Sequence, residues 1–101
     1  MQDRRKYKRI PMCAQVTCVV DTRTCRAVSR NLSRYGMRLE GADLKIAESV
    51  QLTFRLDAHA IMDAVGTVVW ASKRQHGIRF THMGVQSQRS VRRFIVDHSA
   101  R

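Results

Sequence analysis

The chain has 101 residues, of which 44% are hydrophobic, so a single folded domain with a modest core is expected and a disordered chain is excluded. It carries 19 Lys and Arg against 8 Asp and Glu, and the net charge of +11 indicates an anionic partner such as a nucleotide, a nucleic acid, a membrane surface or an acidic protein. No run of about 18 apolar residues is present, so no membrane span is predicted, and the polar N-terminus lacks the apolar segment of a signal peptide.

The N-terminal residues 1–10 are polar and basic and show neither a helix nor a strand period, so a flexible arm is expected ahead of a single domain at 11–101. Beyond Pro11, apolar and polar residues alternate in short runs that end in turn residues, which predicts strands. The six predicted strands cover residues 12–20, 25–29, 37–40, 50–56, 63–70 and 77–81. Gly66 inside the fifth strand indicates a bulge or close packing, and 71–76 is expected to be a basic turn.

The hydrophobic period changes after Gly84. Val91, Phe94, Ile95 and His98 follow at the spacing i, i+3, i+4 and i+7, so they form one face of an amphipathic helix that is expected to dock on the sheet. Six short strands followed by one helix predict a mainly β fold, namely a small six-stranded antiparallel β-barrel with a C-terminal α-helix.

The cysteines and histidines argue against a catalytic or metal-binding protein. Cys13, Cys18 and Cys25 are odd in number, lack Cys-x-x-Cys spacing, and are interpreted as reduced, buried thiols of a cytosolic protein. The histidines lack the spacing of metal ligands and are expected to be solvated loop residues. They are His59, His76, His82 and His98. Because a nucleophile elbow and a glycine-rich phosphate loop are also missing, no catalytic residue, metal site or cofactor is predicted, and the chain is not expected to be an enzyme.

Arginines gather in the N-terminal arm, where residues 4–9 read Arg-Arg-Lys-Tyr-Lys-Arg. Arg5 and Arg9 stand four residues apart. A guanidinium group offers two parallel donors, which match two phosphate oxygens or the two acceptors on the Hoogsteen edge of guanine, whereas the ammonium group of lysine cannot form this fork. The arm is therefore a candidate for binding a nucleotide, and a non-specific electrostatic tail is the alternative.

A second candidate lies at 31–36, Asn-Leu-Ser-Arg-Tyr-Gly, between two predicted strands. Asn31 and Ser33 supply short polar side chains next to the backbone. Gly36 supplies a position that can take a positive φ or let a ligand approach. Taken alone, the segment also fits an ordinary turn.

Together the two segments resemble the PilZ domain, the bacterial receptor module for cyclic di-GMP. The family pattern has Arg-x-x-x-Arg before a strand and Asp or Asn in Asn-x-Ser-x-x-Gly at a strand end. The segments 66–70 (Gly-Thr-Val-Val-Trp) and 77–80 (Gly-Ile-Arg-Phe) look like late strands of the family, so the resemblance covers about residues 4–97. The resemblance implies that cyclic di-GMP is bound by Arg4, Arg5, Arg9, Asn31, Ser33 and Gly36.

The resemblance also implies a role for each residue of the turn. Asn31 would read a guanine edge, Ser33 would form a hydrogen bond with the nucleotide, and Gly36 would leave room for the base. Arg34 and Tyr35 depart from the family, in which many members have a small residue before the glycine. Both are additional candidates for ligand contact, and Tyr35 would either stack on a base or cover the mouth of the barrel.

As a whole, the resemblance implies a single-domain cytoplasmic receptor that changes conformation when the nucleotide orders the arm. Arg4 precedes the family motif, and an extra arginine there is associated with binding an intercalated dimer of the nucleotide. Because so short a chain leaves no room for an output domain, the signal is expected to pass to a separate, unidentified partner protein. Trp70 is expected to be a core or barrel-edge aromatic residue.

Two other functions remain open. Some PilZ-like domains act as protein-interaction adaptors without nucleotide, although the presence of both motifs counts against this here. The charge would also permit a basic barrel that binds RNA or single-stranded DNA. Such proteins usually present several aromatic platforms, and aromatic residues make up 6% of this chain, which disfavours nucleic acid as the partner. The regulated process is not indicated by the sequence.

Overall fold

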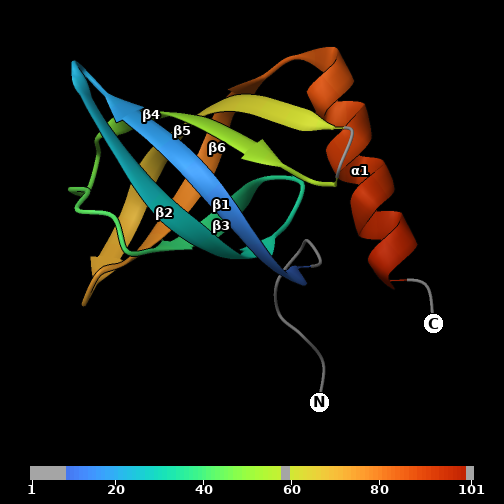
Figure 1. Ribbon diagram of the computed structural model, residues 1–101, viewed down its shortest axis with the longest axis horizontal. Coiled ribbons are helices and arrows are strands. Elements are labelled where there is room, and N and C mark those ends of the chain that lie inside the picture. The colour runs from blue at the N-terminus through green and yellow to red at the C-terminus, as the bar shows by residue number, and fades with distance from the viewer. Residues whose placement is uncertain (1–8, 58–59, 100–101) are drawn as a thin grey trace.

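The structure is a computed structural model that describes residues 9–57 and 60–99. The described residues form six strands and one helix (Figure 1). Their bounds are β1 Ile10–Val20, β2 Arg23–Leu32, β3 Gly36–Glu40, β4 Ser49–Arg55, β5 Ile61–Ser72, β6 Gln75–Met83 and α1 Val85–Ser99. Residues 1–8, which include most of the predicted arm, lie outside the described residues.

The strands close into an antiparallel barrel in the order β1-β2-β3-β6-β5-β4, with β4 pairing back to β1. Closure leaves none of these six strands with an unpaired edge. α1 lies beside one end of the barrel (Figure 1), where it contacts β5 and β1 and buries Val91 and Ile95. The predicted six-stranded barrel with a C-terminal helix is confirmed. No helix of the described residues is long and apolar enough to cross a membrane.

Side-chain alternation explains the barrel wall. In β4, Val50, Leu52 and Phe54 are at most 2% exposed, whereas the residues between them face solvent. This is the pattern that a strand with one face in the core must show. On the predicted face of the helix, Val91 and Ile95 are buried and Phe94 is half-buried. His98 departs from this face: it is exposed and stacks on Phe94 with 3.9 Å between ring centroids.

A basic turn lies within the predicted range 71–76, but the predicted bounds are wrong, because β5 and β6 extend into the range and leave Lys73 and Arg74 as the turn. Both residues have positive φ, 48° and 67°, which non-glycine residues rarely adopt. Gly41 holds Arg74 there: Arg74 Nη2 donates to the Gly41 carbonyl at 2.7 Å, and the Gly41 N–H donates to the Arg74 carbonyl at 3.0 Å. These contacts lie far apart in sequence, so the local pattern did not reveal the longer hairpin.

The histidines correct the expectation of solvated loop residues. His76 lies in β6 and is 4% exposed, and its Nε2 accepts a hydrogen bond from the Leu44 N–H at 3.3 Å. Accepting at Nε2 requires the neutral ring to carry its proton on Nδ1. His82 and His98 are exposed, but they lie in β6 and α1 rather than in loops, and His59 lies outside the described residues.

The cysteines are free thiols, and only Cys18 of the three is fully buried. Cys13 is exposed because it lies an odd number of residues from Cys18 and therefore points to the other face of β1. The expectation of buried thiols is thus wrong for Cys13. Cys18 pairs with Cys25 across β1 and β2. Burial, and then the neighbouring Cys25, raises the pKa of Cys18 to about 12.

This raised pKa predicts selective alkylation. At pH 8 the exposed Cys13 should react with iodoacetamide much faster than the neutral, buried Cys18, which should react only when the barrel opens. Because the pKa is higher in the folded state, the stability contributed by Cys18 is complete below about pH 9 and falls as the pH rises toward 12. The alkylation is stopped at successive times, and mass spectrometry of the digested protein gives the rate at each cysteine. Equal rates for Cys13 and Cys18 would contradict this account.

Candidate functional site

The turn between β2 and β3 is built around Ser33. The Ser33 hydroxyl accepts hydrogen bonds from the N–H groups of Tyr35 at 3.1 Å and Gly36 at 3.2 Å. The Ser33 N–H donates to the Gly36 carbonyl at 2.9 Å. The side chain is 6% exposed, so it closes the turn from inside rather than from the surface.

This arrangement predicts the effect of Ser33→Ala on stability. The substitution leaves the N–H groups of Tyr35 and Gly36 without their acceptor, which should lower the free energy of unfolding by about 1–3 kcal/mol. Urea unfolding followed by circular dichroism measures the change. Ser49→Ala, at the exposed start of β4, is the matched control. Equal stability of the two variants would show that the hydroxyl does not hold the turn.

Asn31 occupies an irregular position in the β2–β3 ladder. The register shifts between Ser29 and Asn31, and the Asn31 Oδ1 accepts the Arg38 N–H at 3.0 Å. The Ser29 hydroxyl donates to the Asn31 carbonyl at 2.9 Å. The side-chain oxygen of Asn31 is therefore bound to the barrel backbone, while its amide NH2 forms no hydrogen bond with the described residues.

Gly36 is required by a close approach rather than by its φ. A Cβ at this position would overlap the carbonyl oxygen of Ile78 on the neighbouring β6. Its φ is not in the left-handed region, which the nearby Gly41 occupies at 95°. Of the two sequence-based explanations for the glycine, close approach is therefore the one that the structure supports.

Beside this turn lies a hollow of about 380 Å³, which we call the barrel groove. Its lining residues are Arg9, Ser33, Tyr35, Gly36, Met37, Val69, Trp70, Gly77, Ile78 and Arg79. Arg9 is exposed and directly precedes β1, whose first residue, Ile10, is already 3% exposed. The start of β1 and the β2–β3 turn, which are distant in sequence, thus meet at one surface. The structure places Arg9, Ser33, Tyr35 and Gly36 together.

Trp70 is a groove residue that the sequence did not identify. It is 38% exposed, so it is not a core residue, and it pairs with Gly77 across β5 and β6. A Cβ on Gly77 would overlap the indole ring, so the glycine provides the space in which the ring lies on the sheet. An exposed aromatic ring fixed against a glycine offers a flat surface for stacking.

Asn31 and Trp70 lie in one row across the outer face of four strands. Asn31 pairs with Arg38, Arg38 with Gly77, and Gly77 with Trp70. Arg38 is half-buried, and its Nε is buried without a hydrogen-bond partner among the described residues. The register places Arg38 between Asn31 and Trp70 in this row, a position that was not expected from the sequence.

Of the remaining predicted residues, Asn31 and Arg34 do not line the groove. Arg34 lines a different hollow, which it shares with Tyr35, whereas Ser33 and Gly36 line the barrel groove. Arg4 and Arg5 lie outside the described residues. Arg79, which was not selected from the sequence, lines the groove together with Arg9.

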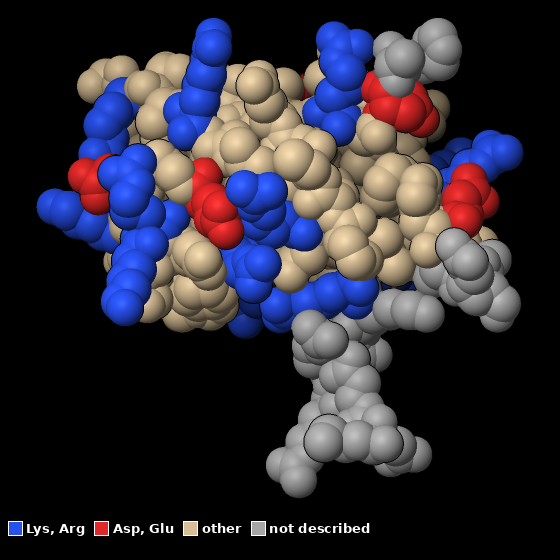
Figure 2. Space-filling view, turned by 60° about the horizontal axis from the view of Figure 1, so that its bottom comes forward, with Lys and Arg blue, Asp and Glu red and all other residues tan. Residues whose placement is uncertain are grey.

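The electrostatics of this surface favour an anion. Figure 2 shows a face on which Lys and Arg groups are spread widely and carboxylates are few. Arg9 and Arg79 both line the groove, and no Asp or Glu lines it. Two guanidinium groups next to an exposed indole ring can bind a phosphate or the acceptor edge of a base while the ring stacks on the base.

Comparison with known proteins agrees with this picture of the fold. A family model described as PilZ domain matches residues 3–97. A comparison with curated proteins finds no match. Among solved structures, the inhibitor of motility MotI/DgrA of Bacillus subtilis superposes with a TM-score of 0.80 at 19% identity, covering 95% of this chain and 51% of that chain.

Two further structures were solved with a ligand. The PilZ domain of Escherichia coli YcgR with cyclic di-GMP has a TM-score of 0.78 at 18% identity, covering 95% of this chain and 92% of that chain. Borreliella burgdorferi PlzA in complex with cyclic di-GMP has a TM-score of 0.74 at 12% identity, covering 91% and 41%. The chain thus spans about half the length of the Bacillus protein and less of PlzA, and at these identities the likeness shows the fold.

Proposed function

This chain belongs to the PilZ domain family, and we propose that it is a receptor for cyclic di-GMP, which it binds without transforming it. The observation that carries the proposal is the barrel groove, where Arg9, Arg79 and the Trp70 ring meet the β2–β3 turn. Cyclic di-GMP presents two guanine bases and two phosphates. The guanidinium groups suit the phosphates and the Hoogsteen edge of guanine, and the indole face suits base stacking.

We assign different tasks to the three residues of the turn motif. The amide NH2 of Asn31 would donate to an acceptor on a guanine edge, because its Oδ1 is already bound to the Arg38 N–H. The Ser33 hydroxyl is engaged within the turn, so its task would be to hold the shape of the turn rather than to contact the nucleotide. Gly36 would keep the floor of the groove low, since any side chain there meets β6.

The N-terminal arm would complete the site. Arg9 stands at the start of β1 beside the groove, so a segment that precedes it begins next to the proposed ligand. Arg5, and Arg4 for a second nucleotide, would bind when the arm closes. Contacts made only in the closed state would shift the population toward it and change the surface that a separate partner protein meets.

Titration calorimetry at moderate salt tests the proposal, with cyclic di-GMP as ligand and GTP and a short single-stranded RNA as controls. Saturable heat with cyclic di-GMP alone is expected, and about two nucleotides per chain would support the role given to Arg4. No heat with cyclic di-GMP would overturn the receptor proposal in favour of an adaptor. Binding of RNA that weakens steeply with salt would identify a nucleic-acid-binding barrel instead.

A further inference from the structure

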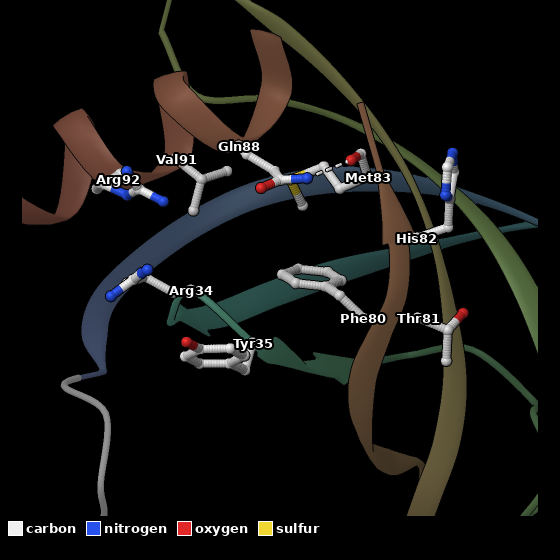
Figure 3. A pocket seen from close by; sticks show the side chains of 9 residues that line it. All are labelled: Arg34, Tyr35, Phe80, Thr81, His82, Met83, Gln88, Val91 and Arg92. Carbon is white, nitrogen blue, oxygen red and sulfur yellow. Dashed lines mark hydrogen bonds between the residues drawn. The ribbon is translucent and has the colours of Figure 1, made fainter. Parts of the chain in front are cut away.

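A second hollow, of about 240 Å³, lies between α1, β6 and the β2–β3 turn (Figure 3). We call it the helix hollow. Arg34 and Tyr35 reach it from the turn, Phe80 from β6, and Val91 and Arg92 from α1. Tyr35 separates the two hollows, because it lines both of them.

Two positive charges face the helix hollow. Figure 3 shows Arg34 extending from the turn and Arg92 from the helix on the same side of the hollow. No Asp or Glu is among its lining residues, and neither arginine forms an ion pair with a carboxylate of the described residues. The Arg34 guanidinium lies 5.5 Å from the centroid of the Tyr35 ring. The two guanidinium charges repel each other across the hollow. A dianion bound between them would attract both and offset that repulsion.

Much of the remaining lining is apolar or already hydrogen-bonded, and His82 and Tyr35 add a ring each. Val91 is 1% and Met83 8% exposed, and with the ring of Phe80 they form an apolar wall. Gln88 Nε2 donates to the Met83 carbonyl at 2.7 Å, and the Thr81 hydroxyl donates to the Val65 carbonyl at 3.2 Å. Arg34 and Arg92 are therefore the arginine and lysine side chains that a ligand in this hollow would meet.

We propose that the helix hollow is a second anion site, separate from the barrel groove, that binds a phosphate monoester carried on an aromatic body. Arg34 and Arg92 would each direct N–H donors at the phosphate, whose charge of about −2 at neutral pH matches the two guanidinium charges. The aromatic body would lie against Phe80 and Val91. The proposal does not depend on cyclic di-GMP binding, because Arg34, Phe80 and Arg92 line the helix hollow and do not line the barrel groove.

Phenyl phosphate tests this site by two-dimensional amide NMR on the full chain. We expect saturable shifts at residues 34–35, 80–83 and 88–92. Arg34→Gln and Arg92→Gln should each weaken the affinity about tenfold or more, since each removes charge-assisted hydrogen bonds. Arg93→Gln is the matched control, because Arg93 is the next residue of α1 and lines another hollow, beside Leu56. Inorganic phosphate and benzoate test the two halves of the ligand and should bind more weakly.

Several outcomes would overturn the proposal. An equal loss of affinity in Arg93→Gln would mean that phenyl phosphate responds to the general charge of the protein. If inorganic phosphate bound as tightly as phenyl phosphate, the aromatic ring of the ligand would contribute nothing to binding, contrary to the proposal. Displacement of phenyl phosphate by one equivalent of cyclic di-GMP would show that the hollow belongs to the nucleotide site. The absence of phenyl phosphate binding by a chain that still binds cyclic di-GMP would overturn this proposal alone.

Discussion

Gly36→Ala should destabilise the protein more than a single methyl group normally does. The added Cβ would overlap the Ile78 carbonyl oxygen, which is part of the β6 backbone and cannot rotate away. To relieve the overlap, β3 must move away from β6 and give up ladder hydrogen bonds. We expect the free energy of unfolding to fall by about 1–3 kcal/mol or more, and the melting temperature by roughly 4–8 °C for each kcal/mol.

Gly84→Ala provides the matched control for this effect. A Cβ on Gly84 meets no atom within 4 Å, so its replacement should change stability by less than about 1 kcal/mol. Calorimetric melting of both variants compares the same chemical change with and without the close approach. If Gly36→Ala and Gly84→Ala melt at the same temperature, the close approach of β3 and β6 does not explain why residue 36 is a glycine.

The second large effect concerns nucleotide binding. Arg9→Ala should weaken cyclic di-GMP binding roughly tenfold to a hundredfold, the range expected for lost charge-assisted hydrogen bonds in the groove. Arg9→Lys should recover only part of the loss, because lysine keeps the charge but not the two parallel donors. Titration calorimetry measures both variants against the unaltered chain.

Arg26→Ala separates a specific contact from general charge. Arg26 is an exposed arginine of β2, and it is not among the residues that line the barrel groove. Its removal lowers the net charge by the same amount as Arg9→Ala. An equal loss of affinity in both variants would mean that cyclic di-GMP is attracted by the charge of the whole domain, and that Arg9 has no particular place in its site.

The barrel could be predicted because its strands alternate cleanly and its helix has a clear period. Val50, Leu52 and Phe54 in β4, and Val91 and Ile95 in α1, show the burial that their spacing indicates. Local chemistry also located the β2–β3 turn. Local chemistry did not show that the Ser33 hydroxyl accepts the N–H groups of Tyr35 and Gly36, because these bonds depend on the backbone conformation of the turn.

Trp70, Arg79 and Arg38 were missed because their place in the site depends on strand register. Trp70 meets Gly77 only because the β5–β6 hairpin turns at Lys73 and Arg74. A two-residue turn there carries neither of the usual signals, Asn or Gly, since tertiary contacts with Gly41 hold its positive φ values. Had that turn been recognised, the pairing of the tryptophan with the glycine would have followed by counting.

The fluorescence of Trp70 tests the central claim most directly, because the chain contains one tryptophan and it lines the proposed nucleotide groove. Cyclic di-GMP should quench its emission or shift it, with saturation at the concentrations that saturate the calorimetric heat. GTP should have no such effect, and Arg9→Ala should require correspondingly more cyclic di-GMP. Saturable heat of binding with unchanged Trp70 emission would contradict the account, because the nucleotide would then bind away from the barrel groove.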